Sequence, residues 1–275
     1  MRSSTRSRPA DHRVTTTGAP HDDVIGSGDV ARMNRWRQLP ARSSAGRFAL
    51  AGLASLAVGS VLAFFVATME TTMNSHDLPV NEWFRDLGLS SALLTSFAEG
   101  ISWIGAGAQT VPVVLFVVVF LVVIKQWRWG LFLLISSQAG LVISHTLKDL
   151  VARDRPPWGI FDPTQTGTSF PSGHTFAGIT AWIAMGIIAL YLFPRPWSTI
   201  LGVALIVIGV LNGPSRLILA RHWITDVLGA WLLAGGWFLL IWSAFLRFWA
   251  PRSEPAPESV PDTVQPDTLE LRDPQ

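Results

Sequence analysis

The stretch from Ser215 to Asp226 places a serine, an arginine, a histidine and an aspartate between two long apolar runs. His222 and Asp226 are four residues apart, so on a helix they would share one face, one turn apart. A carboxylate there can accept the imidazole Nδ1–H and leave Nε2 as an oriented lone pair, as in an activated base or nucleophile. Arg216 can join the pair only if a turn intervenes, because six residues correspond to about 600° of helical rotation. The same pair is also compatible with a structural cap, so the chemistry depends on matching groups elsewhere in the chain.

A second polar cluster, Pro171-Ser172-Gly173-His174, immediately precedes a long apolar run. Ser172 is well suited to cap a helix that starts there, and Gly173 lets a ligand approach the backbone closely. The free N–H groups and the helix dipole at such a start favour an anion. His174 adds a titratable group at the same position.

The third cluster contains Lys148 and Arg155 followed by Pro156. Lys148 and Arg155 are seven residues apart, about 700° of rotation, so on a helix they would lie nearly in register. Pro156 disfavours helical geometry at the residue before it, so the sequence predicts that the helix ends at about Arg155. Both cations would equally suit an interfacial position from which they reach toward water.

Taken together, the three clusters supply three cations, a helix N-terminus and two histidines. This combination favours an anionic, oxygen-rich ligand, and phosphate is the obvious candidate. The sequence predicts neither a metal ion nor another cofactor, because Asp226 is the only carboxylate three or four residues from either of these histidines and the cations would repel a metal.

The composition places these clusters in a membrane protein. Of the 275 residues, 49% are hydrophobic although both ends are polar, so the middle is more apolar than a soluble domain. The formal net charge is only +2, with basic residues concentrated before residue 48, which gives nucleic-acid binding little support. The absence of cysteine excludes disulfides and thiolate chemistry.

The apolar runs predict an all-α fold, a bundle of six transmembrane helices, each close to the roughly 20 residues that a bilayer core requires. The predicted spans are residues 48–69, 103–124, 129–147, 173–193, 198–211 and 224–245. The fifth is short and meets a breaker, Asn-Gly-Pro at 212–214, past which a helix can resume. The acidic segment 70–102 is expected to hold short surface helices, for example over residues 79–88.

Two polar tails, residues 1–46 and 250–275, are predicted to be disordered and to flank a membrane domain of residues 47–249. The arginines before the first span should keep the N-terminus in the cytoplasm, and six spans return the C-terminus to the same side. The sequence therefore predicts a multi-pass protein of the cell membrane with its three polar clusters at the extracytoplasmic ends of spans three to six.

The three clusters, written as Lys148-x6-Arg155-Pro156, Pro171-Ser172-Gly173-His174 and Ser215-Arg216-x5-His222-x3-Asp226, resemble a known three-part motif. It is the motif of the type 2 phosphatidic acid phosphatases, integral-membrane lipid phosphate phosphatases related to the vanadium haloperoxidases. Every position is filled and in order. The resemblance covers residues 148–226, and the tails and the segment before the second span lie outside it.

The resemblance implies a role for each residue of the motif. His222 would attack phosphorus and become phosphohistidine, with Asp226 orienting it, and His174 would protonate the leaving oxygen and then activate water. The phosphate would be bound by the remaining motif residues, Lys148, Arg155, Ser172, Gly173 and Arg216. Three nearby residues outside the motif are expected to be structural or to contact a head group: His145, Arg153 and Arg221.

Several functions remain open at this point. A transporter is not favoured, because transporters place ionisable groups near the bilayer midplane and these clusters lie at span ends. A haloperoxidase-like enzyme would bind vanadate in the same pocket, and a lipid phosphotransferase would differ only in its acceptor. Isoprenoid diphosphate, phosphatidate and phosphatidylglycerophosphate are all compatible substrates, and segment 158–169 is expected to contribute to the choice among them.

Overall fold

The computed structural model describes residues 39–158, 167–194 and 196–250, and all regular structure within these ranges is helical. Most of both predicted tails, and most of segment 158–169, lies outside the described residues. The first helical residues, 42–46, belong to the stretch predicted as tail. The helices are η1 (Arg42–Ser44), α2 (Ala45–Thr68), α3 (Glu70–Ser90), α4 (Ala92–Gly105), α5 (Gly107–Val123), α6 (Trp127–Leu134), η2 (Ile135–Ala139), α7 (Gly140–Val151), α8 (Gly173–Ala177), η3 (Gly178–Ile183), α9 (Ala184–Leu192), α10 (Trp197–Ile218) and α11 (Ile224–Trp249).

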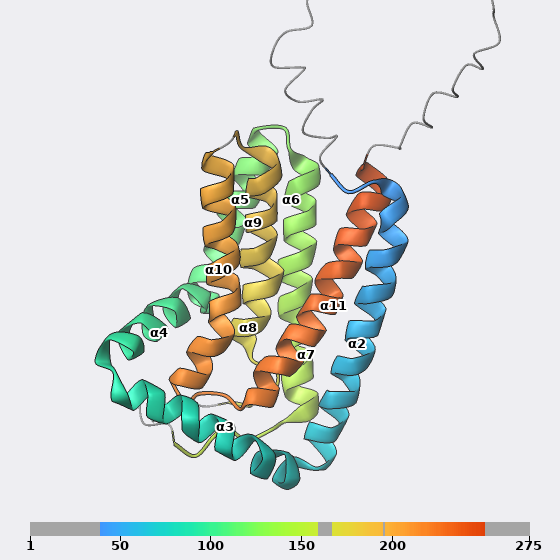
Figure 1. The fold of residues 1–275 in the computed structure, drawn as a ribbon. Coiled ribbons are helices and arrows are strands. Elements are labelled where there is room, and N and C mark those ends of the chain that lie inside the picture. The colour runs from blue at the N-terminus through green and yellow to red at the C-terminus, as the bar shows by residue number, and fades with distance from the viewer. Residues whose placement is uncertain (1–38, 159–166, 195, 251–275) are drawn as a thin grey trace, which may run out of the picture.

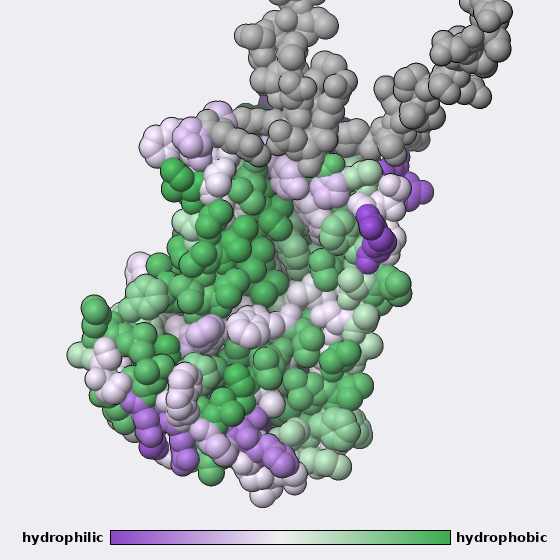
Figure 2. Space-filling view, viewed as in Figure 1, coloured by the Kyte–Doolittle hydropathy of each residue, from purple (hydrophilic) through white to green (hydrophobic). Residues whose placement is uncertain are grey.

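Five helical stretches of the described chain are long and apolar enough to cross a membrane: Arg42–Thr68, Trp127–Val151, Gly173–Leu192, Trp197–Ile218 and Ile224–Trp249. The pair α4 and α5 meets the same test as a unit, although it is bent by 51°. Large apolar side chains are exposed along these helices, and Figure 2 shows the resulting broad hydrophobic surface. The predicted all-helical, multi-pass architecture is therefore confirmed, while the count of six spans stays a prediction.

The second predicted span differs from the structure at its start. Instead of one helix from residue 103, α4 ends at Gly105, and Ala106 is extended (ψ 145°) before α5 begins. Gly105 lies against α10, where a Cβ would be only 1.6 Å from Asn212 Oδ1. The bend therefore occurs where α4 packs backbone-close against another helix, a tertiary contact that hydropathy does not encode.

The predicted break at 212–214 is absent, because α10 continues through it to Ile218. Two side chains bond nearby backbone carbonyls: Asn212 Nδ2 donates to Ile208 O at 2.9 Å, and Ser215 Oγ donates to Asn212 O at 2.9 Å. Neighbouring helices and such hydroxyl groups are what make proline tolerable inside a membrane helix. Packing thus overrides the local breaker.

The acidic segment 70–102 contains α3, a helix of 21 residues, followed by most of α4, rather than several short surface helices. In Figure 1, α3 crosses the end of the bundle at which α7 ends and α8 and α11 begin. Although most of its surface is polar, α3 buries Asp77 and Asn81. Buried polar groups need partners, so α3 must bond to the elements it covers.

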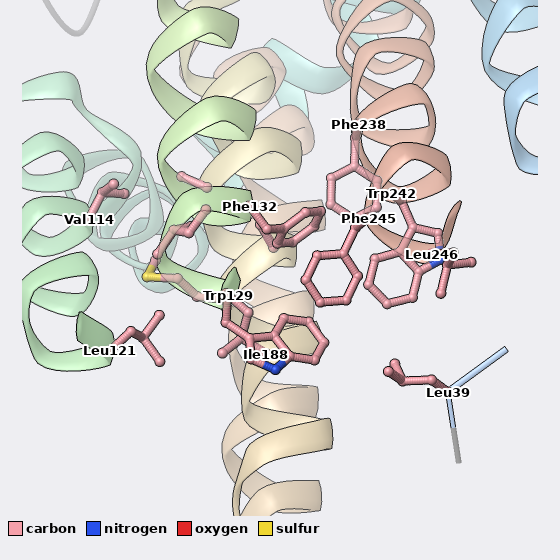
Figure 3. Packing of buried hydrophobic residues seen from close by; sticks show 14 of the residues in the cluster. Leu39, Val114, Leu121, Trp129, Phe132, Ile188, Phe238, Trp242, Phe245 and Leu246 are labelled. Carbon is pink, nitrogen blue, oxygen red and sulfur yellow. The ribbon is translucent and has the colours of Figure 1, made fainter. Parts of the chain in front are cut away.

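The opposite end of the bundle is held by an aromatic core. Trp129, Phe132, Trp242 and Phe245 are all buried, with the Trp129 and Phe245 rings 4.4 Å apart (Figure 3). The helices also approach closely through glycine, since a Cβ on Gly178 would lie 2.3 Å from the carbonyl oxygen of Gly209. This tight packing fixes the direction in which α7, α8, α10 and α11 present their polar ends.

Candidate active site

The three polar clusters converge at the end of the bundle that α3 crosses. Arg155 Nη1 lies 3.4 Å from His222 Nε2, which joins the third cluster to the first. The backbone N–H of Ser172 donates to Asp226 O at 3.1 Å, which joins the second to the first. A Cβ on Gly173 would lie 3.7 Å from Lys148 Cε, so the remaining pair is also in contact.

His222 and Asp226 meet, but not through a shared helical face. His222 lies in the connection between α10 and α11, two residues before α11 begins, so no helix runs through both residues. Asp226 is instead in the first turn of α11, where its Oδ2 accepts the backbone N–H of Trp223 at 2.9 Å. The same oxygen lies 3.2 Å from His222 Nδ1. Helix capping therefore fixes the carboxylate beside the imidazole.

A turn separates Arg216 from His222, as their spacing requires. The helix α10 ends at Ile218, Ala220 adopts φ 51°, and the N–H of Arg221 donates to Arg216 O at 2.9 Å. Arg216 itself is buried and donates through Nη1 to Ser102 Oγ on α4. The turn brings both residues to the same end of the bundle.

Lys148 and Arg155 occupy different kinds of backbone. The helix α7 ends at Val151 with Ala152 in the left-handed region (φ 51°), so the predicted end near Arg155 is four residues too late. Left-handed residues commonly terminate helices before a proline is reached. Lys148 Nζ donates to Thr168 O at 2.8 Å, and Arg155 Nε donates to Gly167 O at 3.0 Å. Both cations therefore also hold the backbone segment that leads into α8.

Ser172 occupies the N-cap position of α8, as predicted, but its hydroxyl makes no capping bond to the described backbone. Its Oγ instead accepts a hydrogen bond from Thr175 Oγ1 at 2.9 Å. The expectation of a side-chain cap is therefore wrong. The first N–H groups of α8, with Gly173 and His174 in its first turn, remain available for an anion.

His222 is neutral in this environment. Its pKa is lowered well below the ordinary 6.5, first by burial and then by the positive charges of Arg216, Arg155 and Lys148. With Nδ1–H directed at Asp226, the Nε2 lone pair faces the guanidinium of Arg155. A neutral, oriented imidazole among cations is suited to attack an anionic electrophile.

Two side chains outside the motif contribute to this arrangement. Arg153, expected to be structural or to contact a head group, is fully buried, and its Nη1 donates to Asp226 Oδ1 at 2.7 Å, which agrees with the structural alternative. Ser169 Oγ donates to the other oxygen, Asp226 Oδ2. Nothing in the local sequence distinguishes Arg153 from an interfacial cation. In the described parts of the chain, no three His, Asp or Glu side chains gather as a metal site would require.

Comparison with known proteins agrees with the geometry. The family model described as the PAP2 superfamily matches residues 127–250. The chain is 33% identical over 127 residues to an undecaprenyl-diphosphatase of Sulfolobus acidocaldarius, covering 44% of this chain and 57% of that protein. It is 28% identical over 152 residues to phosphatidylglycerophosphatase B of Bacillus subtilis, covering 54% and 73%. The chain thus spans little more than half the length of the first of these relatives.

A solved structure shares the fold. The crystal structure of the first transmembrane PAP2 type phosphatidylglycerolphosphate phosphatase from Bacillus subtilis superposes with a TM-score of 0.57 at 24% identity. The superposition covers 70% of this chain and 94% of that one. All three polar clusters lie inside the matched segment, whereas α3 precedes it. The likeness to the PAP2 superfamily therefore covers residues 127–250 and includes the whole candidate site.

Proposed function

We propose that this protein is an integral-membrane lipid phosphatase that removes a terminal phosphoryl group through a phosphohistidine at His222, without a metal ion. The observation that carries the proposal is the placement of His222, with Nδ1 3.2 Å from Asp226 Oδ2 and Nε2 3.4 Å from Arg155 Nη1. The matched relatives are phosphatases by name, which supports the same class of reaction.

In the first step, the Nε2 lone pair of His222 forms a bond to phosphorus while the bond from phosphorus to the lipid oxygen breaks. Asp226 holds the Nδ1 proton and stabilises the positive charge that develops on the imidazole. Lys148, Arg155 and Arg216 balance the charge on the phosphoryl oxygens, helped by the N-terminus of α8. His174 donates a proton to the leaving oxygen.

In the second step, water attacks the phosphohistidine. The oxygen of water forms a bond to phosphorus, the N–P bond breaks, and the water proton passes to His174, which restores the state needed for the next turnover. Inorganic phosphate then leaves. A lipid phosphotransferase would follow the same first step and deliver the phosphoryl group to an alcohol in place of water.

The proposed site lies on the extracytoplasmic side. The described chain begins at Leu39 and ends at Ala250 at one end of the bundle, and α3 crosses the other (Figure 1). The arginines before the first span favour a cytoplasmic position for the former end. Because the chain contains no cysteine, single cysteines report position without interference. Ser75→Cys on α3 should react with an impermeant maleimide on intact cells, and Gln126→Cys between α5 and α6 should react only after lysis.

The function itself is tested with purified protein and a panel of lipids: an isoprenoid diphosphate, phosphatidate and phosphatidylglycerophosphate. We expect phosphate release from at least one of them and an acid-labile phosphoenzyme that is absent from His222→Ala. Adding an alcohol acceptor separates hydrolysis from transfer, because a transferase would release less phosphate and form a new phosphate ester. Turnover in the absence of any phosphoenzyme would contradict the covalent mechanism.

A further inference from the structure

A buried polar network behind the candidate active site takes no part in the steps described above. It joins Asn74 and Asp77 of α3 to Arg153 and through it to Asp226. Arg153 and Asp226 are 0% exposed and Asp77 is 3% exposed. Burying three charges is unfavourable unless each is paired and hydrogen-bonded, so the arrangement calls for an explanation.

Arg153 uses its whole guanidinium in this network. Nη1 donates to Asp226 Oδ1 at 2.7 Å and to Thr225 Oγ1 at 2.6 Å. Nη2 donates to Asp77 Oδ2 at 2.8 Å and to Asn74 Oδ1 at 2.6 Å, and Nε donates to the same Asn74 oxygen at 3.0 Å. These five bonds engage all five donors of a rigid, planar group. The position of Arg153 therefore fixes the direction of the Asp226 carboxylate.

The carboxylate of Asp226 divides its two oxygens between two tasks. Oδ1 is held by Arg153, while Oδ2 lies beside His222 Nδ1 and accepts the N–H of Trp223. Without its partner on Oδ1, the carboxylate would be held only through Oδ2, by the Trp223 N–H and Ser169 Oγ, and could turn about that oxygen, which would change the direction of Oδ2 toward the imidazole. Outer partners of this kind orient the groups that they hold and are often needed for full activity.

We propose that Arg153 and Asp77 are positioning residues for the reaction: Asp77 fixes the Arg153 guanidinium, which turns Asp226 so that Oδ2 orients His222. This inference rests on the proposed function. It assigns part of the reaction geometry to α3, which lies before residues 127–250 and hence outside the matched family segment. Arg153 acts through Asp226 and has no contact of its own with the phosphate.

The isosteric change Asp77→Asn tests the proposal, with Glu82→Gln as its matched control. Both remove one carboxylate from α3, but Glu82 is exposed. Loss of a charge-assisted hydrogen bond and a small misplacement of the nucleophile should lower kcat about 10- to 100-fold. KM should stay within about twofold, since the phosphate-binding cations are untouched. Glu82→Gln should match wild type, and an unchanged kcat in Asp77→Asn would overturn the proposal.

A double variant distinguishes positioning from general support of the fold. If Asp77 acts through Asp226, adding Asp77→Asn to Asp226→Asn should lower kcat no further, because residues that act as a unit are not additive. Losses that multiply would overturn the proposal. Arg153→Lys, which keeps the charge, should retain more activity than Arg153→Gln and provides a second variant if Asp77→Asn does not fold.

Failure of the proposed function would give a different result. If wild type releases phosphate from no lipid, the function is wrong, and the network is then tested by the reactivity of His222 alone. Carbethoxylation of His222 by diethyl pyrocarbonate, mapped by mass spectrometry, reports the nucleophilicity of its imidazole. Asp77→Asn should slow this modification relative to Glu82→Gln, and equal rates would overturn the inference.

Discussion

The side-chain amide of Asn81 donates to the backbone carbonyl of His222 at 2.7 Å, although 141 positions separate the two residues. Its oxygen also accepts the N–H of Ile224 at 2.9 Å. One side chain of α3 thus satisfies a carbonyl and an amide on either side of Trp223, where no helix supplies partners. The connection between α10 and α11, which carries His222, is therefore held by a residue that lies before the segment 127–250 matched by the family model.

Asn81→Asp should impair the reaction while leaving the protein folded. The variant keeps the acceptor for Ile224 but replaces the donor to His222 with an oxygen that repels the carbonyl. A lost buried hydrogen bond costs about 1–3 kcal/mol, so we expect kcat to fall roughly 10- to 100-fold. Ser90→Ala, elsewhere on α3, is the control. Normal turnover in Asn81→Asp would show that the connection does not depend on this amide.

His222→Ala should abolish turnover, because no other side chain of the motif is placed to carry the phosphoryl group. Asp226→Asn should reduce kcat by up to about 10⁴-fold, by analogy with the orienting carboxylate of a serine triad. The fold should survive this second change, because Arg153 keeps its ion pair with Asp77 at 2.8 Å. Steady-state kinetics and thermal unfolding in detergent would measure both effects. Residual turnover in His222→Ala would contradict the covalent step.

The pH profile should reflect the neutral state of His222. Its pKa lies below the ordinary 6.5, so kcat/KM should hold its plateau through pH 6.5 as the pH falls and decline only at lower values. Arg155→Gln removes one of the charges that lower this pKa and should move the acidic limb to higher pH on the same substrate. An acidic limb at the same pH in wild type and Arg155→Gln would contradict the assignment of this limb to His222.

The stability of the folded protein should also depend on the protonation of His222. Below about pH 6.5 the unfolded chain takes up a proton at His222, whereas the folded chain does so only at lower pH. The unfolded state then binds more protons, so this group's contribution to stability is present above pH 6.5 and decreases as the pH falls through the folded pKa. Thermal unfolding of His222→Ala, compared with wild type across this window, would isolate the effect.

Activity should survive an excess of chelator, because the cations of the protein itself balance the phosphoryl charge. Vanadate should inhibit competitively, since it adopts the five-coordinate geometry of the phosphorus in the transition state. The measurement is phosphate release with EDTA, and then with added magnesium. Loss of turnover with EDTA that magnesium restores would show that a metal ion takes part.

His174→Ala should separate two classes of substrate. A lipid monophosphate expels an alkoxide whose conjugate acid is about as weak an acid as water, so loss of the general acid should slow the first step by ~10²–10⁴. A lipid diphosphate expels a phosphate monoester, whose second ionisation occurs at about pH 6, and this leaving group needs little help from an acid. With diphosphates, phosphohistidine should accumulate because the second step still lacks its base. Rapid-quench experiments on both substrates would test this, and equal first-step losses would show that His174 only binds phosphate.

Much of the architecture could be predicted from the sequence because its signals are local. The apolar runs exceed what a soluble domain needs, and a membrane helix satisfies its own backbone groups, so composition and length suffice to locate most spans. Local rules failed where packing intervened. The sequence Asn-Gly-Pro at 212–214 was expected to break the fifth span but lies inside α10. The helix α7 ends at Val151, four residues before Arg155, although the next residue, Ala152, carries no special sequence signal.

By itself, the sequence determined which groups are available for chemistry: two histidines, an aspartate and three cations in three short motifs. The tertiary structure decided how they meet. His222 and Asp226 are brought together by the capping of α11, and Arg153 reaches Asp226 across 73 positions. Asp77, Asn74 and Asn81 carry no motif, and their partners lie 76, 79 and 141 positions away. Contacts at such separations depend on how the helices cross, and the local periodicity of a sequence does not encode the way in which helices cross.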